Sequence, residues 1–287
     1  MIRVSNLSYR YPGTQADMLK GIDFAIEDAE ILGFLGPSGA GKSTTQNILI
    51  GLLSGYRGSI EVMGRELSDW GQDYYQHIGV SFEFPNHYLK LTARENLGFF
   101  ASLYAGETRS PDEVLEMVGL SADADKRVSD YSKGMKIRLN VARALIHSPK
   151  LLFLDEPTSG LDPVNGRKIK DLVLGLRETG TTVFVTTHNM NLADELCDRV
   201  AFIADGAIEA VDSPQALKKA HGRRMLRVEY TNGAQAPEAA EFPLDGLGEN
   251  DEFNALLRSG ARLETVHSQE TTLEKVFIDV TGRELVA

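Results

Sequence analysis

The sequence predicts an α/β fold built on a mainly parallel β-sheet that is covered on both faces. Residues Ile31–Leu35 form a short apolar run typical of a buried strand, and a glycine-rich loop and a helical pattern follow it. Strand patterns return at residues 151–154, 183–187 and 200–204, with a helical pattern between the first two. Strands that alternate with helices favour a parallel sheet covered on both faces.

Helix starts are predicted from capping signals. Thr92 with Glu95, and Ser110 with Glu113, form capping-box patterns inside a mostly helical region at residues 84–149. Both patterns predict that a helix begins at the next residue.

Other boundaries follow from periodicity and from turn residues. Residues 42–53 carry apolar side chains at helical spacing. Asp162 opens a later helix that Gly180 ends. Asp205 and Gly206 lie between two apolar runs and predict a β-hairpin.

We expect two domains of unequal size. Residues 1–220 form the main domain, which contains a helical subdomain at about 84–149. Residues 221–287 form a small α+β appendage. Its expected elements are strands at 225–230 and 263–267, helices at 252–257 and 273–280, and a turn at Asn232 and Gly233.

Composition describes an acidic globular chain. Hydrophobic residues make up 42% of the 287 residues, and 30 Lys plus Arg stand against 41 Asp plus Glu, a net charge of −11. Affinity for nucleic acid comes largely from basic surface, so nucleic acid is not the expected partner. The most basic stretch, residues 218–227, is interpreted as a solvated linker.

The sequence shows no pattern of a signal peptide or of a membrane-spanning helix. The single cysteine, Cys197, excludes an intrachain disulfide and suits a reducing compartment. The N-terminal residues have no apolar signal-peptide core, and no stretch approaches the roughly 18 apolar residues of a spanning helix. Any membrane role is therefore expected to be peripheral.

A phosphate-binding loop follows the first buried strand. The motif G-x-x-x-x-G-K-[ST] is matched by Gly36, Pro37, Ser38, Gly39, Ala40, Gly41, Lys42 and Ser43. Its glycines let backbone N–H groups point at phosphate oxygens, and the helix N-terminus that follows favours an anion. We expect Lys42 to reach the β- and γ-phosphates and Ser43 to ligate Mg²⁺. Thr44, next in the chain, is included in the predicted nucleotide site.

Two acids follow the buried strand at residues 151–154. Asp155 and Glu156 should lie at the carboxyl edge of the sheet, where ligands of open α/β sheets bind. Asp155 is placed to hold Mg²⁺, and Glu156 to orient or deprotonate the attacking water. Together with the loop they predict a P-loop NTPase (RecA-like) core, with the helical subdomain and antiparallel β elements beside it. The loop alone says only that the chain binds a nucleotide.

The segment Tyr131–Met135 resembles the signature motif of the ATP-binding cassette family, whose usual form is L-S-G-G-Q. Ser132 and Gly134 match it, whereas Tyr131, Lys133 and Met135 depart from it. Ser132 is also a good N-cap for the helix that follows. The resemblance implies that Ser132 and Gly134 bind the γ-phosphate of ATP held by a second copy, so that two cassettes sandwich two nucleotides.

Three further matches follow the order of that family. Asp162 lies in a segment that resembles the loop coupling the two sites across the dimer. His188 follows an apolar strand, where the family carries its γ-phosphate-sensing histidine. Tyr11 matches the aromatic residue that stacks on adenine, with Tyr9 as the weaker candidate. The resemblance covers about residues 1–220.

One residue near the expected Mg²⁺ site departs from the family pattern. The family normally has glutamine at the position of Glu83, where it contacts Mg²⁺ and hinges the helical subdomain. An ionised glutamate adds charge beside the metal and cannot donate a hydrogen bond. Our hypothesis is that Glu83 still ligates Mg²⁺ but alters hydrolysis or its coupling; the alternative is a tolerated replacement without a special role.

The resemblance implies an ATPase that drives a membrane transporter with ATP and Mg²⁺. Glu83, the signature segment and the C-terminal residues 273–277 and 281–285 resemble bacterial drug- and antibiotic-export cassettes. The expected partners are a separate transmembrane permease and a second copy of the cassette. The chain would then lie at the cytoplasmic face of the cell membrane and touch it only through the permease.

Two other functions compete with the transporter interpretation. A soluble cassette ATPase could act on ribosomes or DNA, but such relatives carry two cassettes, long coiled coils or zinc sites, and this acidic chain has none of them. A nucleotide kinase or GTPase would share only the phosphate loop and would not need Ser132, Gly134 and His188.

Overall fold

The computed structural model describes residues 1–222, 225–232, 237–269 and 271–283. The chain forms two compact units, Met1–Pro214 together with Arg283, and Gln215–Gly282. Arg283 pairs with Asp205 within the first unit.

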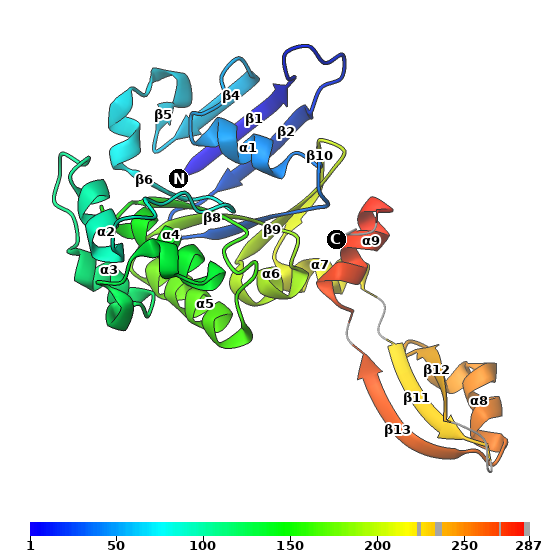
Figure 1. The fold of residues 1–287 in the computed structure, drawn as a ribbon. Coiled ribbons are helices and arrows are strands. Elements are labelled where there is room, and N and C mark those ends of the chain that lie inside the picture. The colour runs from blue at the N-terminus through cyan, green and yellow to red at the C-terminus, as the bar shows by residue number, and fades with distance from the viewer. Residues whose placement is uncertain (223–224, 233–236, 270, 284–287) are drawn as a thin grey trace. The chain divides into compact units, whose positions relative to one another are not determined.

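A six-stranded sheet forms the centre of the first unit (Figure 1). Its order is β10-β9-β3-β8-β7-β6, and all neighbours are parallel except β10 and β9. The strands are β3 (Ile31–Leu35), β6 (Ile78–Ser81), β7 (Leu151–Asp155), β8 (Thr182–Thr187), β9 (Arg199–Ala204) and β10 (Ala207–Asp212). The predicted α/β class with a mainly parallel sheet is confirmed.

An antiparallel sheet of order β2-β1-β4-β5 packs against one face of the central sheet. Its strands are β1 (Ile2–Tyr9), β2 (Leu19–Ile26), β4 (Arg57–Val62) and β5 (Arg65–Glu66). Phe24 of β2 lies 5.1 Å from Phe34 of β3 between ring centres, and Phe34 lies 5.3 Å from Phe184 of β8. These buried rings join the two sheets into one core.

Four helices pack on the central sheet. They are α1 (Lys42–Leu49), α4 (Lys133–Leu145), α5 (Pro163–Glu178) and α6 (Met190–Leu196). Helix α1 contributes Ile48 and Leu49 to the core shared with the antiparallel sheet, whereas α4 contacts β6 and β7, α5 contacts β8 and α6 contacts β3. The side chains of β7 from Leu151 to Leu154 are all buried, as covered parallel strands require.

Helix α1 is shorter than predicted. The expected helix at 42–53 ends at Leu49 because Gly51 adopts a left-handed φ of +76°. Leu52, counted in its apolar face, is 59% exposed.

The other predicted boundaries are confirmed. Helices α2 (Ala93–Ala101) and α3 (Pro111–Met117) begin at complete capping boxes made by Thr92 and Ser110. Asp162 caps α5, and the β9–β10 hairpin turns at Asp205 and Gly206, both with positive φ.

The second unit contains a three-stranded antiparallel sheet of order β12-β11-β13. Its elements are α7 (Pro214–His221), β11 (Met225–Thr231), β12 (Glu238–Pro243), α8 (Asp251–Arg258), β13 (Arg262–Gln269) and α9 (Leu273–Thr281). Helix α8 packs on the sheet through Phe253, whose ring lies 5.2 Å from that of Phe242.

Some expectations for this region need correction. Strand β12 was not predicted, because within it only Phe242 is buried. The stretch at 218–227 is not a plain linker, since its described residues belong mostly to α7 and β11; residues 223 and 224 lie outside the described part. So do Gly233 of the expected turn and residues 284 and 285 of the C-terminal resemblance.

No helix in the described ranges is long and apolar enough to cross a membrane.

Candidate active site

The loop between β3 and α1 is shaped by glycines. Gly39 and Gly41 have φ values of +78° and +112°, which disfavour any other residue. A side chain at Gly36 would meet the carbonyl oxygen of Ile203 at 2.1 Å. The loop therefore curls tightly over the N-terminus of α1, as a backbone cradle for phosphate requires.

Lys42 points into this loop. Its Nζ donates to the carbonyl oxygens of Gly36 at 2.6 Å and Pro37 at 3.0 Å. Burial lowers the pKa of Lys42, and the carboxylates of Glu156, Asp155 and Glu83 oppose that shift. A partly desolvated cation is thus held at the mouth of the loop, opposite the acids.

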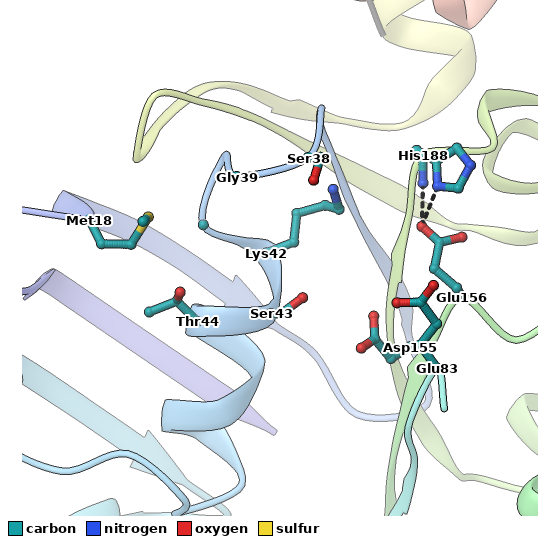
Figure 2. A pocket seen from close by; sticks show the side chains of 11 residues that line it. Met18, Ser38, Gly39, Lys42, Ser43, Thr44, Glu83, Asp155, Glu156 and His188 are labelled. Carbon is teal, nitrogen blue, oxygen red and sulfur yellow. Dashed lines mark hydrogen bonds and ion pairs between the residues drawn. The ribbon is translucent and has the colours of Figure 1, made fainter. Parts of the chain in front are cut away.

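A cavity of about 300 Å³ brings ten of the predicted site residues together. Its lining consists of Met18, Ser38, Gly39, Gly41, Lys42, Ser43, Thr44, Glu83, Asp155, Glu156 and His188. Figure 2 shows Lys42 and Ser43 on one side and Asp155, Glu83 and Glu156 on the other, with the Ser43 hydroxyl turned toward the acids. Met18 is the one lining residue that the sequence did not suggest.

Asp155 ends β7 beside Thr186 of the parallel strand β8. The Thr186 hydroxyl donates to Asp155 Oδ1. Burial raises the pKa of Asp155, while this hydrogen bond acts in the opposite direction.

Glu156 turns out of the strand with a left-handed φ of +46°. Its Oε2 accepts from Thr187 Oγ1 at 2.9 Å, and its Oε1 accepts from the backbone N–H of His188 at 2.9 Å. The Nδ1 atom of His188 lies 2.6 Å from the same Oε1, while the His188 side chain is 58% exposed. The end of β8 therefore holds both oxygens of the carboxylate.

The two threonines were missed at the level of sequence. Thr186 and Thr187 directly precede His188, and each hydroxyl bonds one of the two consecutive acids. Two buried hydroxyl residues at a strand end were a signal, but assigning their partners required the register of β7 and β8.

The remaining loop residues support the cradle rather than line the cavity. Gly36 and Pro37 accept from Lys42, and Ala40 is buried. The Tyr11 hydroxyl lies 3.0 Å from Thr44 Oγ1. Tyr9 is buried and packs edge-on against Tyr11, which leaves Tyr11 as the more accessible aromatic side chain.

Ser132, Gly134 and Asp162 do not line this cavity. Ser132 caps α4, and its Oγ accepts from the backbone N–H of Met135 at 3.2 Å. Asp162 caps α5, and the Asn165 side chain and N–H groups hold its pKa below the usual range. Within one chain, these residues are not part of the site around Lys42.

The oxygen donors suit a nucleotide-bound magnesium ion. No group of three or more His, Cys, Asp or Glu side chains able to hold a metal exists among the described residues. The oxygen donors that line the cavity include the Ser43 hydroxyl and the carboxylates of Asp155 and Glu83. Mg²⁺ accepts one or two such ligands and completes its shell with phosphate oxygens and water, so the set fits.

The curled loop, its lysine and the acids at the carboxyl edge of a parallel sheet define a P-loop nucleoside triphosphatase. Comparison with known proteins narrows this class. A family profile described as ABC transporter matches residues 19–159, and one described as fluoroquinolone efflux ABC transporter C-terminal domain matches residues 224–270.

Individual relatives agree with these profiles. The chain is 56% identical over 285 residues to the fluoroquinolones export ATP-binding protein of Mycobacterium tuberculosis, a match covering 99% of this chain and 94% of that protein. It is 33% identical to the bacitracin transport ATP-binding protein BcrA of Bacillus licheniformis, covering 98% and 97%. A dimeric ATP-binding cassette, solved in a post-hydrolysis state with ADP and Pi, matches with a TM-score of 0.68 and 30% identity over 74% of this chain and 98% of that one.

The chain belongs to the ATP-binding subunits of ABC transporters. It is an ATPase with the cassette fold, and the transporter interpretation is favoured over a soluble ATPase acting on ribosomes or DNA.

Proposed function

We propose that the chain is the ATP-hydrolysing motor of a drug exporter, in which two copies sandwich two nucleotides. The observation that carries this proposal is the 56% identity to a fluoroquinolones export ATP-binding protein over nearly the whole chain. The separate profile match at residues 224–270 extends the similarity beyond the cassette. Residues 1–220 would be the nucleotide-binding domain and 221–287 a small domain characteristic of this type of exporter.

Several residues in and beside the cavity have proposed roles. Lys42 and the loop N–H groups bind the β- and γ-phosphates, and Tyr11 stacks on adenine. Glu156 orients or deprotonates the attacking water, and His188 binds the γ-phosphate while it contacts Glu156. Ser43, Asp155 and Glu83 would hold Mg²⁺, which neutralises charge that develops on the phosphates. Glu83, in place of the usual glutamine, is proposed to change the rate or its coupling.

The residues outside the cavity would complete the site of a second copy. Ser132 exposes the N-terminus of α4, a helix of 13 residues whose end favours an anion. Ser132 and Gly134 are proposed to bind the γ-phosphate held by the partner copy, and Asp162 to couple the two sites. ATP binding closes this dimer and hydrolysis reopens it, which biases the permease between two states.

The proposed permease is a separate membrane protein that selects the drug. Its expected substrates belong to the fluoroquinolone class, by analogy with the related export protein. This chain would lie peripherally at the cytoplasmic face of the membrane through that permease. Nucleic acid is not an expected partner of a chain with a net charge of −11.

The test is to purify the tagged chain from native membranes in mild detergent and to identify its partners by mass spectrometry. We expect a stoichiometric protein with several membrane spans. Cells that carry Glu156→Gln should accumulate a fluorescent fluoroquinolone to a higher level than wild-type cells. Recovery of ribosomal or DNA-repair proteins, with drug accumulation unchanged, would contradict the exporter.

A further inference from the structure

Helix α1 carries a buried amide that none of the roles above uses. The Gln46 side chain is 1% exposed and shares the helix with the core residues Ile48 and Leu49. Buried polar groups are nearly always hydrogen-bonded, because an unpaired one destabilises the fold. The polar contact of this amide is to Thr186, since Gln46 Oε1 lies 3.3 Å from Thr186 Oγ1.

Thr186 connects this amide to Asp155. Thr186 is fully buried, and its hydroxyl is closer to Asp155 Oδ1 than to Gln46. A hydroxyl has one proton, and an ionised carboxylate can only accept. The proton is therefore donated to Asp155. Gln46 Oε1 lies on the Thr186 side of the amide. Because the oxygen and nitrogen of an amide exchange places by a half-turn, we infer that the N–H group is turned toward Thr186 Oγ1 and donates to it.

This chain of contacts joins the two sides of the proposed metal site. Ser43 and Gln46 lie three residues apart on α1, so they share one face of the helix. Asp155 ends β7, and Thr186 is its partner in the register of β8. Through Thr186, the contacts with Gln46 and Asp155 therefore connect the helix that carries the Ser43 hydroxyl with the strand that carries the Asp155 carboxylate.

We propose that Gln46 and Thr186 are positioning residues that fix Asp155 relative to Ser43 and thereby set the affinity for nucleotide-bound Mg²⁺. Partners that hydrogen-bond a metal ligand orient it, and their loss typically weakens metal binding about 10- to 100-fold. This inference rests on the proposed role of Asp155 as a metal ligand. A merely structural pair would affect the stability of the fold and leave metal affinity unchanged.

The experiment measures binding of a fluorescent, non-hydrolysable ATP analogue to the full chain while Mg²⁺ is varied. Gln46→Leu and Thr186→Val should raise the Mg²⁺ midpoint about 10- to 100-fold, with binding of the metal-free analogue unchanged. Thr186→Ser keeps the hydroxyl and should restore the wild-type midpoint. Melting temperatures confirm that each variant is folded, and Gln46→Met replaces Gln46→Leu if the latter does not fold.

Two controls separate the possible failures. Thr182→Val removes an equally buried hydroxyl from the other end of β8, where it accepts from the backbone N–H of Ala29 at 2.9 Å, and should leave the midpoint unchanged. Asp155→Asn must raise the midpoint. If it does so while Gln46→Leu and Thr186→Val do not, the positioning role is wrong. If Asp155→Asn has no effect, the metal role of Asp155 and the inference built on it both fail.

Discussion

Lys42 and Glu156 carry opposite charges on facing sides of the cavity, and hydrogen bonds hold each of them in place. Lys42 is held by two loop carbonyl groups, and Glu156 by Thr187 and His188. This arrangement orients the two groups before a nucleotide is bound, so little reorganisation is needed during reaction. Glu156 is only 10% exposed, which places the carboxylate inside the cavity rather than in bulk water.

Glu156→Gln tests the proposed general base. The amide retains the shape of the side chain but cannot take a proton, so kcat should fall by about 10²- to 10⁴-fold. Affinity for ATP should persist, because the loop and Lys42 are unaltered. Phosphate release and equilibrium ATP binding measure the two effects. Normal turnover in this variant would exclude Glu156 as the catalytic carboxylate.

His147 predicts a pH dependence of stability. The His147 ring stacks on Tyr104 at 3.9 Å, and its Nε2 lies 2.9 Å from the carbonyl oxygen of Ile78. Burial lowers the pKa of His147 from 6.5 to about 4. Between these values the unfolded state binds a proton that the folded state does not, so stability decreases as pH falls from 6.5 toward 4.

Replacing this histidine should weaken that dependence. His147→Gln keeps an N–H donor for Ile78 but does not titrate. We expect urea unfolding to show a smaller loss of stability between pH 7 and pH 4.5 than in the wild type. An equally steep loss would show that other groups, such as His87, whose pKa burial also lowers, account for the effect.

At the scale of elements, the ends of strands carry the chemistry. Strand β3 leads into the phosphate loop, β7 ends in Asp155, and β8 ends in Thr187. The sequence predicts these strands well, because a run of apolar residues that meets its first polar residue marks the carboxyl edge of the sheet. It does not predict which residues of β7 and β8 are neighbours, since pairing between distant segments is a property of the folded chain.

Because pairing between distant segments is not visible in the sequence, some residues and boundaries were not predicted. Thr186, Thr187 and Gln46 have no short motif, and their roles exist only through contacts that the fold brings together. The predicted helix at 42–53 extends beyond the true end of α1, because apolar residues keep helical spacing past Gly51. The backbone of Gly51 has a left-handed φ, which ends the helix. Strand β12 was missed because within it only Phe242 is buried.

Helix α4 is joined to the loop that carries Glu83. Asn140 is 1% exposed, and its Nδ2 donates to Phe82 O at 2.7 Å and to Ser81 Oγ at 3.0 Å. Arg143 donates to Asn86 O at 3.0 Å from the same helix. The loop beside the proposed metal site and the helix capped by Ser132 are therefore held together by direct hydrogen bonds.

Asn140→Leu removes two of these hydrogen bonds with little change in volume. The carbonyl group of Phe82 loses a partner, so the free energy of unfolding should fall by about 1–3 kcal/mol. Affinity for ATP should remain as in the wild type, because Asn140 does not line the cavity. Urea denaturation measures the free energy of unfolding, and nucleotide titration measures the affinity for ATP. Unchanged stability would mean that the hydrogen bonds of Asn140 make no net contribution to the free energy of unfolding.

At the scale of the whole molecule, one chain holds only part of the proposed machinery. Lys42 and Glu156 lie together, whereas Ser132 and Gly134 line no part of that cavity. The sequence predicts both groups of residues, and the family resemblance implies that they act in different copies. In the proposed symmetric dimer, each copy contributes one half of both sites.

Mixing two inactive variants tests this central claim most directly. Lys42→Ala removes the proposed phosphate-binding lysine, and Ser132→Arg blocks the helix end that is proposed to face the partner copy, so each variant alone should be inactive. A mixed dimer has one site in which both residues are intact. Random pairing makes half of the dimers mixed, so the recovered rate should reach up to roughly a quarter of the wild-type rate. ATP hydrolysis that reappears on mixing would support the sandwich dimer; a mixture as inactive as its components, although dimers are present, would contradict it.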